Sequence, residues 1–312
     1  MSCNGAYTMA TMTETPETTT TTLKPSHDYH AEAHVLSGHL QRPIEQKIER
    51  QAPVTLHDRR GGHLTRHAED VSVEGLISFT KGETRVSGAR SLKNNGWVTL
   101  STSILEGLNV FEIITADRLV SQVSTDHPYK DGHQPHVTFL GTQFTNLRVS
   151  GFPVTLKLNL GICGDRPAND RSYLQDRKFL SGVKEQIERI AKANGLPKEI
   201  KDQYDEKLAY INKLISTSDA DDQGCHEPIT CSLVQSIGEI PIPGVQTFGH
   251  VLLIPEFGAV ALGEIEVGEK VYEPKERPNT YFELTGIKMK LGCVGDGAVL
   301  AATTTANGAH RP

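Results

Sequence analysis

The sequence lacks any apolar run of the roughly 18 to 20 residues that a membrane-spanning helix requires, which excludes a helical membrane span. Aromatic residues make up only 6% of the 312 residues, so few rings are available to stack on bases or sugars. Basic residues are outnumbered, 32 against 38 acidic ones, and a broad phosphate-neutralising surface is not expected. We therefore expect no nucleic-acid partner, and a protein partner if the chain is a binding module.

A secretory signal is also missing from the start of the sequence. Residues 1–23 contain neither a basic segment nor an apolar core of about 7 to 15 residues, and the sequence as written predicts a cytoplasmic protein. Eight threonines fall between positions 11 and 22, so residues 1–28 are predicted to form a disordered Thr-rich tail. Residues 301–312 are small and polar without a hydrophobic anchor, and we predict a second flexible tail there.

The cysteines are odd in number, namely Cys3, Cys163, Cys225, Cys231 and Cys293. Without an export signal, reduced thiols are the default state. Cys225 and Cys231 lie in an acidic segment whose carboxylates raise a thiol pKa, which disfavours a nucleophilic role. This pair is interpreted either as structural buried thiols, as a local disulfide, or as half of a metal site.

What the sequence has in abundance is strand and turn residues, with 28 Gly, 16 Pro and 29 Thr. Alternating apolar and polar positions predict antiparallel strands on both sides of a central segment. The predicted strands cover residues 31–36, 71–80, 84–88, 97–104, 108–124, 137–149, 154–160, 231–240, 250–255, 258–271 and 281–293.

Between residues 170 and 216 the apolar period changes from two to 3.6, which predicts two helices. Asn169 or Asp170 is expected to cap the first helix, and Pro197 suits the first turn of the second. The short connection between them requires an antiparallel pair. The sequence thus predicts a mainly β protein, one antiparallel β-sandwich domain over residues 29–300, with an inserted helical hairpin whose apolar stripes cover the sheet or mediate a dimer.

A dense polar cluster extends from Asp126 to His136. It contains the possible metal ligands Asp126, His127, Asp131, His133 and His136. Imidazoles and carboxylates of this kind bind Zn²⁺ or another divalent metal. The spacing matches no helical zinc motif, and the prolines and glycine between them also fit a solvated hairpin tip.

Several strand and turn phrases resemble the choice-of-anchor P family of bacterial β-rich domains. They are Ala31–Val35, Thr115–Ser121, Phe144–Gly151, Phe257–Val260 and Phe282–Leu291. The resemblance implies a β-sandwich, an exported or surface location, and no catalytic residues to carry over. The sequence departs from this family in having no export signal, no anchor and a long helical insertion.

No Gly-rich phosphate loop, nucleophile elbow or HExxH pattern occurs. Our leading hypothesis is therefore a non-enzymatic structural or protein-interaction module without a cofactor, in which the hairpin mediates self-association into a homo-oligomer or binds a partner protein. The alternative is a metal-dependent hydrolase or oxygenase that uses His127, His133 or His136 with Asp126 or Asp131.

Overall fold

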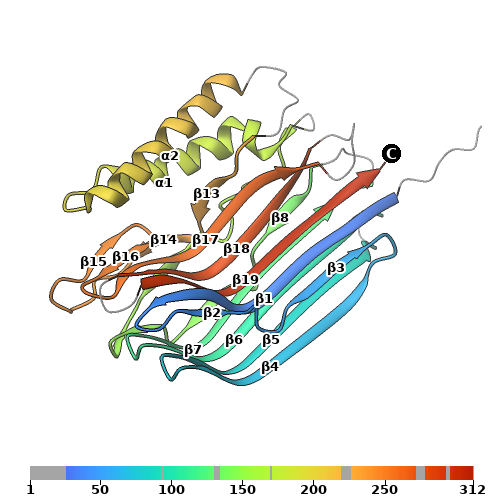
Figure 1. The fold of residues 1–312 in the computed structure, drawn as a ribbon. Helices are drawn as coiled ribbons and strands as arrows, with labels where there is room; N and C mark the ends of the chain where they lie inside the picture. The colour runs from blue at the N-terminus through green and yellow to red at the C-terminus, as the bar shows by residue number, and fades with distance from the viewer. Residues whose placement is uncertain are drawn as a thin grey trace, which may run out of the picture.

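Two antiparallel sheets stack face to face, and a pair of helices lies against the outer side of one of them (Figure 1). The computed structural model describes residues 26–92, 95–129, 134–168, 171–218, 226–271, 278–292 and 296–311. The predicted fold class, a mainly β antiparallel sandwich with an inserted helical hairpin, is confirmed.

Sheet A contains nine strands. In spatial order its main path is β15 (Gln246–Phe248), β16 (Val251–Ile254), β17 (Gly258–Lys270), β18 (Asn279–Leu291), β19 (Asp296–Arg311), β1 (Ser26–Arg42) and β2 (Gln46–Ile48). Two shorter strands pair beside this path, β13 (Ile229–Ser232) with β17 and β3 (Val54–Asp58) with β1.

Sheet B contains eight strands. Its main path is β11 (Phe152–Pro153), β10 (Arg148–Val149), β7 (Ile114–His127), β6 (Trp97–Val110), β5 (Ile77–Arg90) and β4 (Gly62–Val73). The short strands β8 (His136–Thr138) and β9 (Gln143–Thr145) both pair with β7, and β12 (Leu156–Leu158) forms a separate pair with β14 (Val234–Ile237).

The chain ends differ from the prediction. Residues 301–311 do not form a flexible tail; they belong to β19, which lies between β18 and β1 and pairs with both. The side chains of Ala301, Ala302 and Thr304 are fully buried. At the other end, β1 already includes residues 26–28, while the rest of the predicted N-terminal tail lies outside the described residues.

The side chains of sheet B change face partway along each long strand. On β6, Leu105 and Leu108 both enter the core although they are three residues apart. Between them Gly107 adopts φ +66°, and on the edge strand Asp70 adopts φ +50° at the corresponding row of the ladder. A residue in this conformation reverses the alternation of side chains, as in a β-bulge. We call this row the side-chain switch.

Sheet A has the same feature. Gly263 on β17 adopts φ +59° and Ala302 on β19 adopts φ +54°, in one row across the sheet. Because of this switch, Ala261 and Glu264 both point outward from β17, toward the helices. A period of two carried along the whole strand would have placed them on opposite faces.

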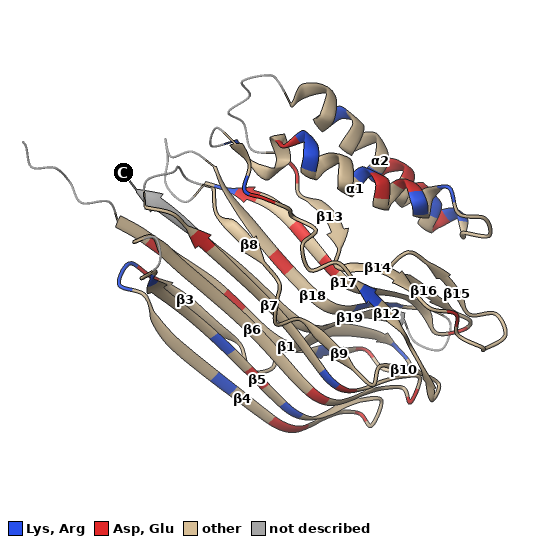
Figure 2. Cartoon of the chain, turned by 180° about the vertical axis from the view of Figure 1, so that it is seen from behind, with Lys and Arg blue, Asp and Glu red and all other residues tan. Residues whose placement is uncertain are grey.

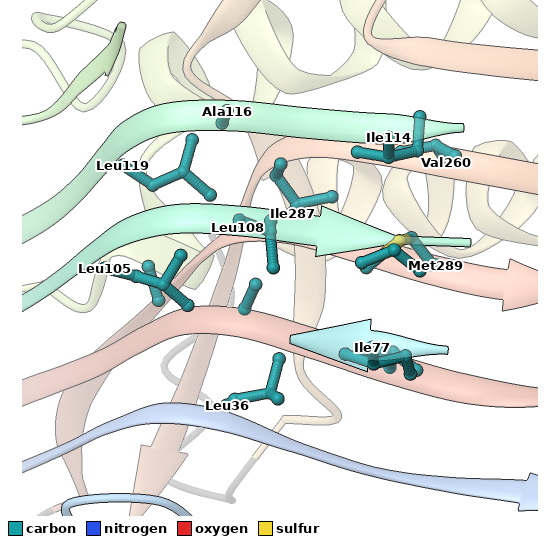
Figure 3. Packing of buried hydrophobic residues seen from close by; sticks show 14 of the residues in the cluster. Leu36, Ile77, Leu105, Leu108, Ile114, Ala116, Leu119, Val260, Ile287 and Met289 are labelled. Carbon is teal, nitrogen blue, oxygen red and sulfur yellow. The ribbon is translucent and has the colours of Figure 1, made fainter. Parts of the chain in front are cut away.

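The core between the sheets is apolar on one side of the two switches. Figure 3 shows part of it, with Leu108, Ile114 and Ile287 packed between the sheets. On the other side the sheets are joined by small hydroxyl groups. Ser101 Oγ donates to the carbonyl of Glu32 at 2.7 Å, and Ser103 Oγ donates to that of His34 at 2.9 Å. These bonds connect β6 of sheet B to β1 of sheet A.

The helical hairpin consists of α1 (Arg177–Ala191) and α2 (Lys198–Thr217), preceded by the 3₁₀ turn η2 (Tyr173–Gln175). The N-cap of α1 is Asp176, whose carboxylate accepts from the Lys178 amide at 2.9 Å. The predicted caps Asn169 and Asp170 lie outside the described residues.

The hairpin lies on the sheet with its apolar stripes inward. Leu180, Val183 and Ile187 of α1 and Ile211 of α2 are buried in one cluster with the residues of sheet A beneath them. Gln186 fixes α1 to β13, since its side chain both donates to and accepts from the Ser232 backbone, at 2.9 and 2.7 Å. The exposed helix faces carry mixed charges (Figure 2). Among the described helices, none is both long and apolar enough to span a bilayer.

Candidate functional site

The predicted metal-site residue His127 is part of the core. It is fully buried at the end of β7, opposite Trp97 in the ladder. The His127 ring lies 4.6 Å from that of His27, and the His27 ring stacks on Trp97 at 5.3 Å. These three rings fill one end of the sandwich, where Trp97 belongs to an apolar cluster with Tyr29 and Val86.

The other predicted ligands do not join His127. Asp126 pairs with His136 across β7 and β8, so these two side chains share one face of the sheet while His127 points to the opposite face. His136 is exposed. Asp131 and His133 lie outside the described residues. Within the described ranges no group of three His, Cys, Asp or Glu side chains is placed to hold a metal ion.

The two cysteines that the structure describes are buried free thiols, which fits a structural role. Cys163 and Cys231 are buried free thiols in the cluster between the hairpin and sheet A. Burial raises the pKa of both, that of Cys231 to about 12. Neither thiol is therefore activated as a nucleophile. Cys225 lies outside the described residues, and so does the predicted Cys225–Cys231 pair.

The structure contains a pocket that the sequence did not suggest. It lies between α2 and the outward face of β16, β17 and β18, and its volume is about 550 Å³. This is within the usual range of small-molecule pockets, about 300 to 1,000 Å³. The apolar part of its lining comprises Pro197, Ile200, Val251, Leu253, Ile254, Pro255, Ala259, Ala261 and Leu291.

Strand β17 forms the floor of this pocket. Ala259 and Ala261 leave room beneath α2 because their side chains are small, and the switch at Gly263 then turns Glu264 to the same side. Across the ladder, Ala261 pairs with Lys288 of β18, which faces outward with it. The floor thus changes from apolar to charged along β17.

The charged end of the pocket is organised around Glu264. Its carboxylate is nearly buried and accepts from Lys288 Nζ at 2.5 Å. Burial alone would raise the pKa of this carboxyl, but the ammonium groups of Lys288 and Lys207 outweigh burial and leave it below its usual value. Glu264 therefore remains an anion and holds Lys288 in place.

The α2 side of the charged end contains Tyr204 and Lys207. The Tyr204 hydroxyl hydrogen-bonds to His250 Nε2 at 3.3 Å, and the Lys207 ammonium lies 4.9 Å from the centre of the Tyr204 ring. Burial lowers the pKa of Lys207, opposed by the charge of Glu264. Burial also lowers the pKa of His250 to about 4, so its imidazole is neutral at physiological pH.

The pocket can bind a molecule with an apolar part and a polar end. Its residues come from α2 and three strands distant in the sequence, and none of them belongs to a recognisable motif. The small residues at alternate positions of residues 258–263 were the only local signal that something packs loosely against this strand.

Comparison with known proteins places the chain in a family of unknown function. No curated protein and no solved structure matches the chain. One family model matches residues 27–268. This match covers all of sheet B, the hairpin and most of β17. The chain belongs to the family described as Domain of unknown function (DUF8256).

Proposed function

We propose that this protein is a non-enzymatic binding module whose pocket between α2 and sheet A takes a small molecule with an apolar part. The observation that carries the proposal is the pocket itself, about 550 Å³ with a mainly aliphatic floor beneath α2. The hydrogen bonds between Gln186 and Ser232 hold the hairpin over the sheet, so the pocket is preformed.

The proposal keeps the hairpin as the binding element but changes what it binds. The sequence suggested that its apolar stripes serve self-association or a protein partner. In the fold these stripes are already used against sheet A, with Leu180, Val183 and Ile211 buried there. Ile200 of α2 is only partly buried, and it lines the pocket.

The metal-dependent alternative has less support. The ladder directs the side chains of His127 and His136 to opposite faces of sheet B, so these two cannot bind one metal ion together. His127 also packs against aromatic rings in the interior. A binding role for the pocket needs no rearrangement of this kind.

The proposal is tested by blocking the pocket. The Ala261→Trp variant places an indole in the floor, and Ala89→Trp places the same group on an exposed position of sheet B as a matched control. Binding of the neutral fluorescent probe N-phenyl-1-naphthylamine is measured by titration, with the fold of each variant checked by circular dichroism.

We expect wild type and Ala89→Trp to bind one probe molecule per chain, and Ala261→Trp to lose that binding while remaining folded. Equal binding by all three proteins would place the probe elsewhere and contradict the proposal. Absence of binding by folded wild-type protein would contradict it as well.

A further inference from the structure

We infer that the polar end of the ligand is a carboxylate, and that Lys207 is the residue that holds it. This inference rests on the proposed function, since it concerns the same pocket. The ligand class is then an amphipathic monocarboxylate, with its aliphatic part over Ala259 and Ala261 and its anionic end beside α2.

The charges of the pocket are unequal. Three lysines line it, Lys207, Lys288 and Lys290, against the nearly buried carboxylate of Glu264 and the exposed one of Glu199 at the start of α2. The Glu264 carboxylate is already paired with the Lys288 ammonium group in a salt bridge. Lys290 and Glu199 are exposed, so water screens both of them. What remains at the inner end is the charge of Lys207.

Lys207 forms no direct salt bridge with the described residues; the nearest anion acting on it, Glu264, is already bonded to Lys288. No carboxylate in that part of the chain lies within 4 Å of its ammonium group, and its contact is the face of the Tyr204 ring. The side chain is half-buried beneath α2. Burial removes part of the hydration of this ammonium group, and no direct salt bridge replaces it. An anionic group that entered the pocket would stabilise the charge through a charge-assisted hydrogen bond.

The charges at this end of the pocket favour binding of a monoanionic group, such as a carboxylate, over binding of a dianionic phosphate. Lys207 and Lys288 together carry two positive charges and Glu264 one negative charge, so the net charge at this end is +1. A dianion would bring its second charge close to the fixed Glu264 carboxylate. The pocket also contains no arginine, the residue best suited to bidentate phosphate binding.

The inference is tested with three ligands of equal chain length that differ only at the polar end: decanoate, decanol and decylamine. Each displaces N-phenyl-1-naphthylamine from the wild-type protein at pH 7. We expect decanoate to bind at least about tenfold more tightly than decanol, as a charge-assisted hydrogen bond allows, and decylamine to bind most weakly.

Two variants of α2 assign the preference to one residue. Lys207→Met removes the ammonium and keeps an unbranched side chain, so the preference for decanoate over decanol should disappear while decanol still binds. Lys213→Met removes an exposed lysine of the same helix outside the pocket and should keep the wild-type preference. For wild type, the preference should fade as the pH rises toward the lowered pKa of Lys207.

The possible failures are distinguishable. If decanol and decanoate bind wild type equally, or if Lys207→Met keeps the preference, the carboxylate inference is overturned while the pocket proposal stands. Tighter binding of decylamine would overturn it in favour of a cation held by Glu264. If none of the three displaces the probe, the proposed function fails with it.

Discussion

The ring of Tyr29 on β1 lies against the backbone of Gly88 on β5, in the opposite sheet. A Cβ atom at Gly88 would lie 2.5 Å from both Cγ and Cδ1 of that ring. Tyr29 is 3% exposed, and its neighbours on the same face of β1 are Ala31 and Ala33. The two sheets therefore approach closely at this end, and the tyrosine fits only because residue 88 has no side chain.

Gly88→Ala is expected to destabilise the protein. The added methyl group must displace the Tyr29 ring or part the sheets, and overpacking of this kind costs about 1 to 3 kcal/mol. Urea unfolding followed by the fluorescence of the single tryptophan, Trp97, which is 5% exposed, measures the change. A free energy of unfolding equal to that of wild type would show that the contact is not tight.

The control for this substitution is Gly182→Ala in α1. A Cβ there meets no atom within 4 Å, and the position is helical. Alanine in a helix interior is favoured over glycine by about 0.5 to 1 kcal/mol, so this variant should be more stable than wild type. The same Gly→Ala substitution is thus expected to lower the free energy of unfolding at residue 88 and to raise it at residue 182.

The elements that the sequence predicted well are those set by local patterns. The helices of residues 177–191 and 198–217 follow from an apolar period of 3.6 and a short connection, both visible in the chain. The hairpin of β5 and β6 follows from flanking alternation around a turn signal at residues 94–96. Periodicity identifies such elements because burial on one face is a local requirement.

Several predicted strands were wrong because a turn divides them, as it does at residues 71–80 and 108–124. Residues 108–124 were predicted as one strand, yet Phe111 and Glu112 adopt φ +53° and +56° and form a turn between β6 and β7. Residues 71–80 are likewise divided by a turn at Glu74 and Gly75, with φ +50° and +69°. Bulky residues rarely adopt this conformation, so here the ladder on both sides imposes it.

The pocket could not be predicted because it depends on contacts between distant segments. Alternation along residues 258–271 indicates two faces, but the switch at Gly263 exchanges them halfway. Nor does a period of 3.6 in α2 indicate which strand lies under Lys207. The C-terminal strand was missed for a related reason, since Ala and Thr carry little apolar signal and are chosen here for the close approach of the sheets.

Two truncations of the C-terminus should impair folding to different extents. Removal of residues 308–312 shortens β19 only where it pairs with β1, so the protein should fold with reduced stability. Removal of residues 301–312 deletes most of a strand between β18 and β1 and exposes the edges of both, and this version should be insoluble or unfolded. A soluble, cooperatively unfolding protein after the longer truncation would contradict the central position of β19.

The described cysteines should resist alkylation in the folded protein. Burial raises the thiol pKa of Cys163 well above its usual value and that of Cys231 to about 12, so little thiolate forms near pH 8. After a brief pulse of iodoacetamide, mass spectrometry of peptides should find both residues unmodified without urea and modified with it. Equal labelling under the two conditions would show that the cluster beneath the hairpin opens readily.

Stability should fall in mild acid because two imidazoles are buried in their neutral form. Burial lowers the pKa of His34 and of His250 to about 4 in the folded protein, against about 6.5 for an unfolded chain. Between these values only the unfolded state binds the protons, so the free energy of unfolding decreases as the pH falls from about 6.5 to about 4. Each imidazole contributes up to about 3 kcal/mol over this range.

Urea unfolding at pH 7, 5.5 and 4.5 measures this slope. The double variant His34→Gln/His250→Gln retains polar side chains that can hydrogen-bond to Ser37 and Tyr204 but cannot take up the protons. Its free energy of unfolding should change less between pH 7 and 4.5 than that of wild type. The lowered pKa of Glu264 acts in a lower window, because its contribution is lost only as the pH falls below the usual carboxyl range. A slope in the double variant as steep as in wild type would assign the acid sensitivity to groups other than these two histidines, such as His30, whose pKa burial also lowers, or the carboxylates.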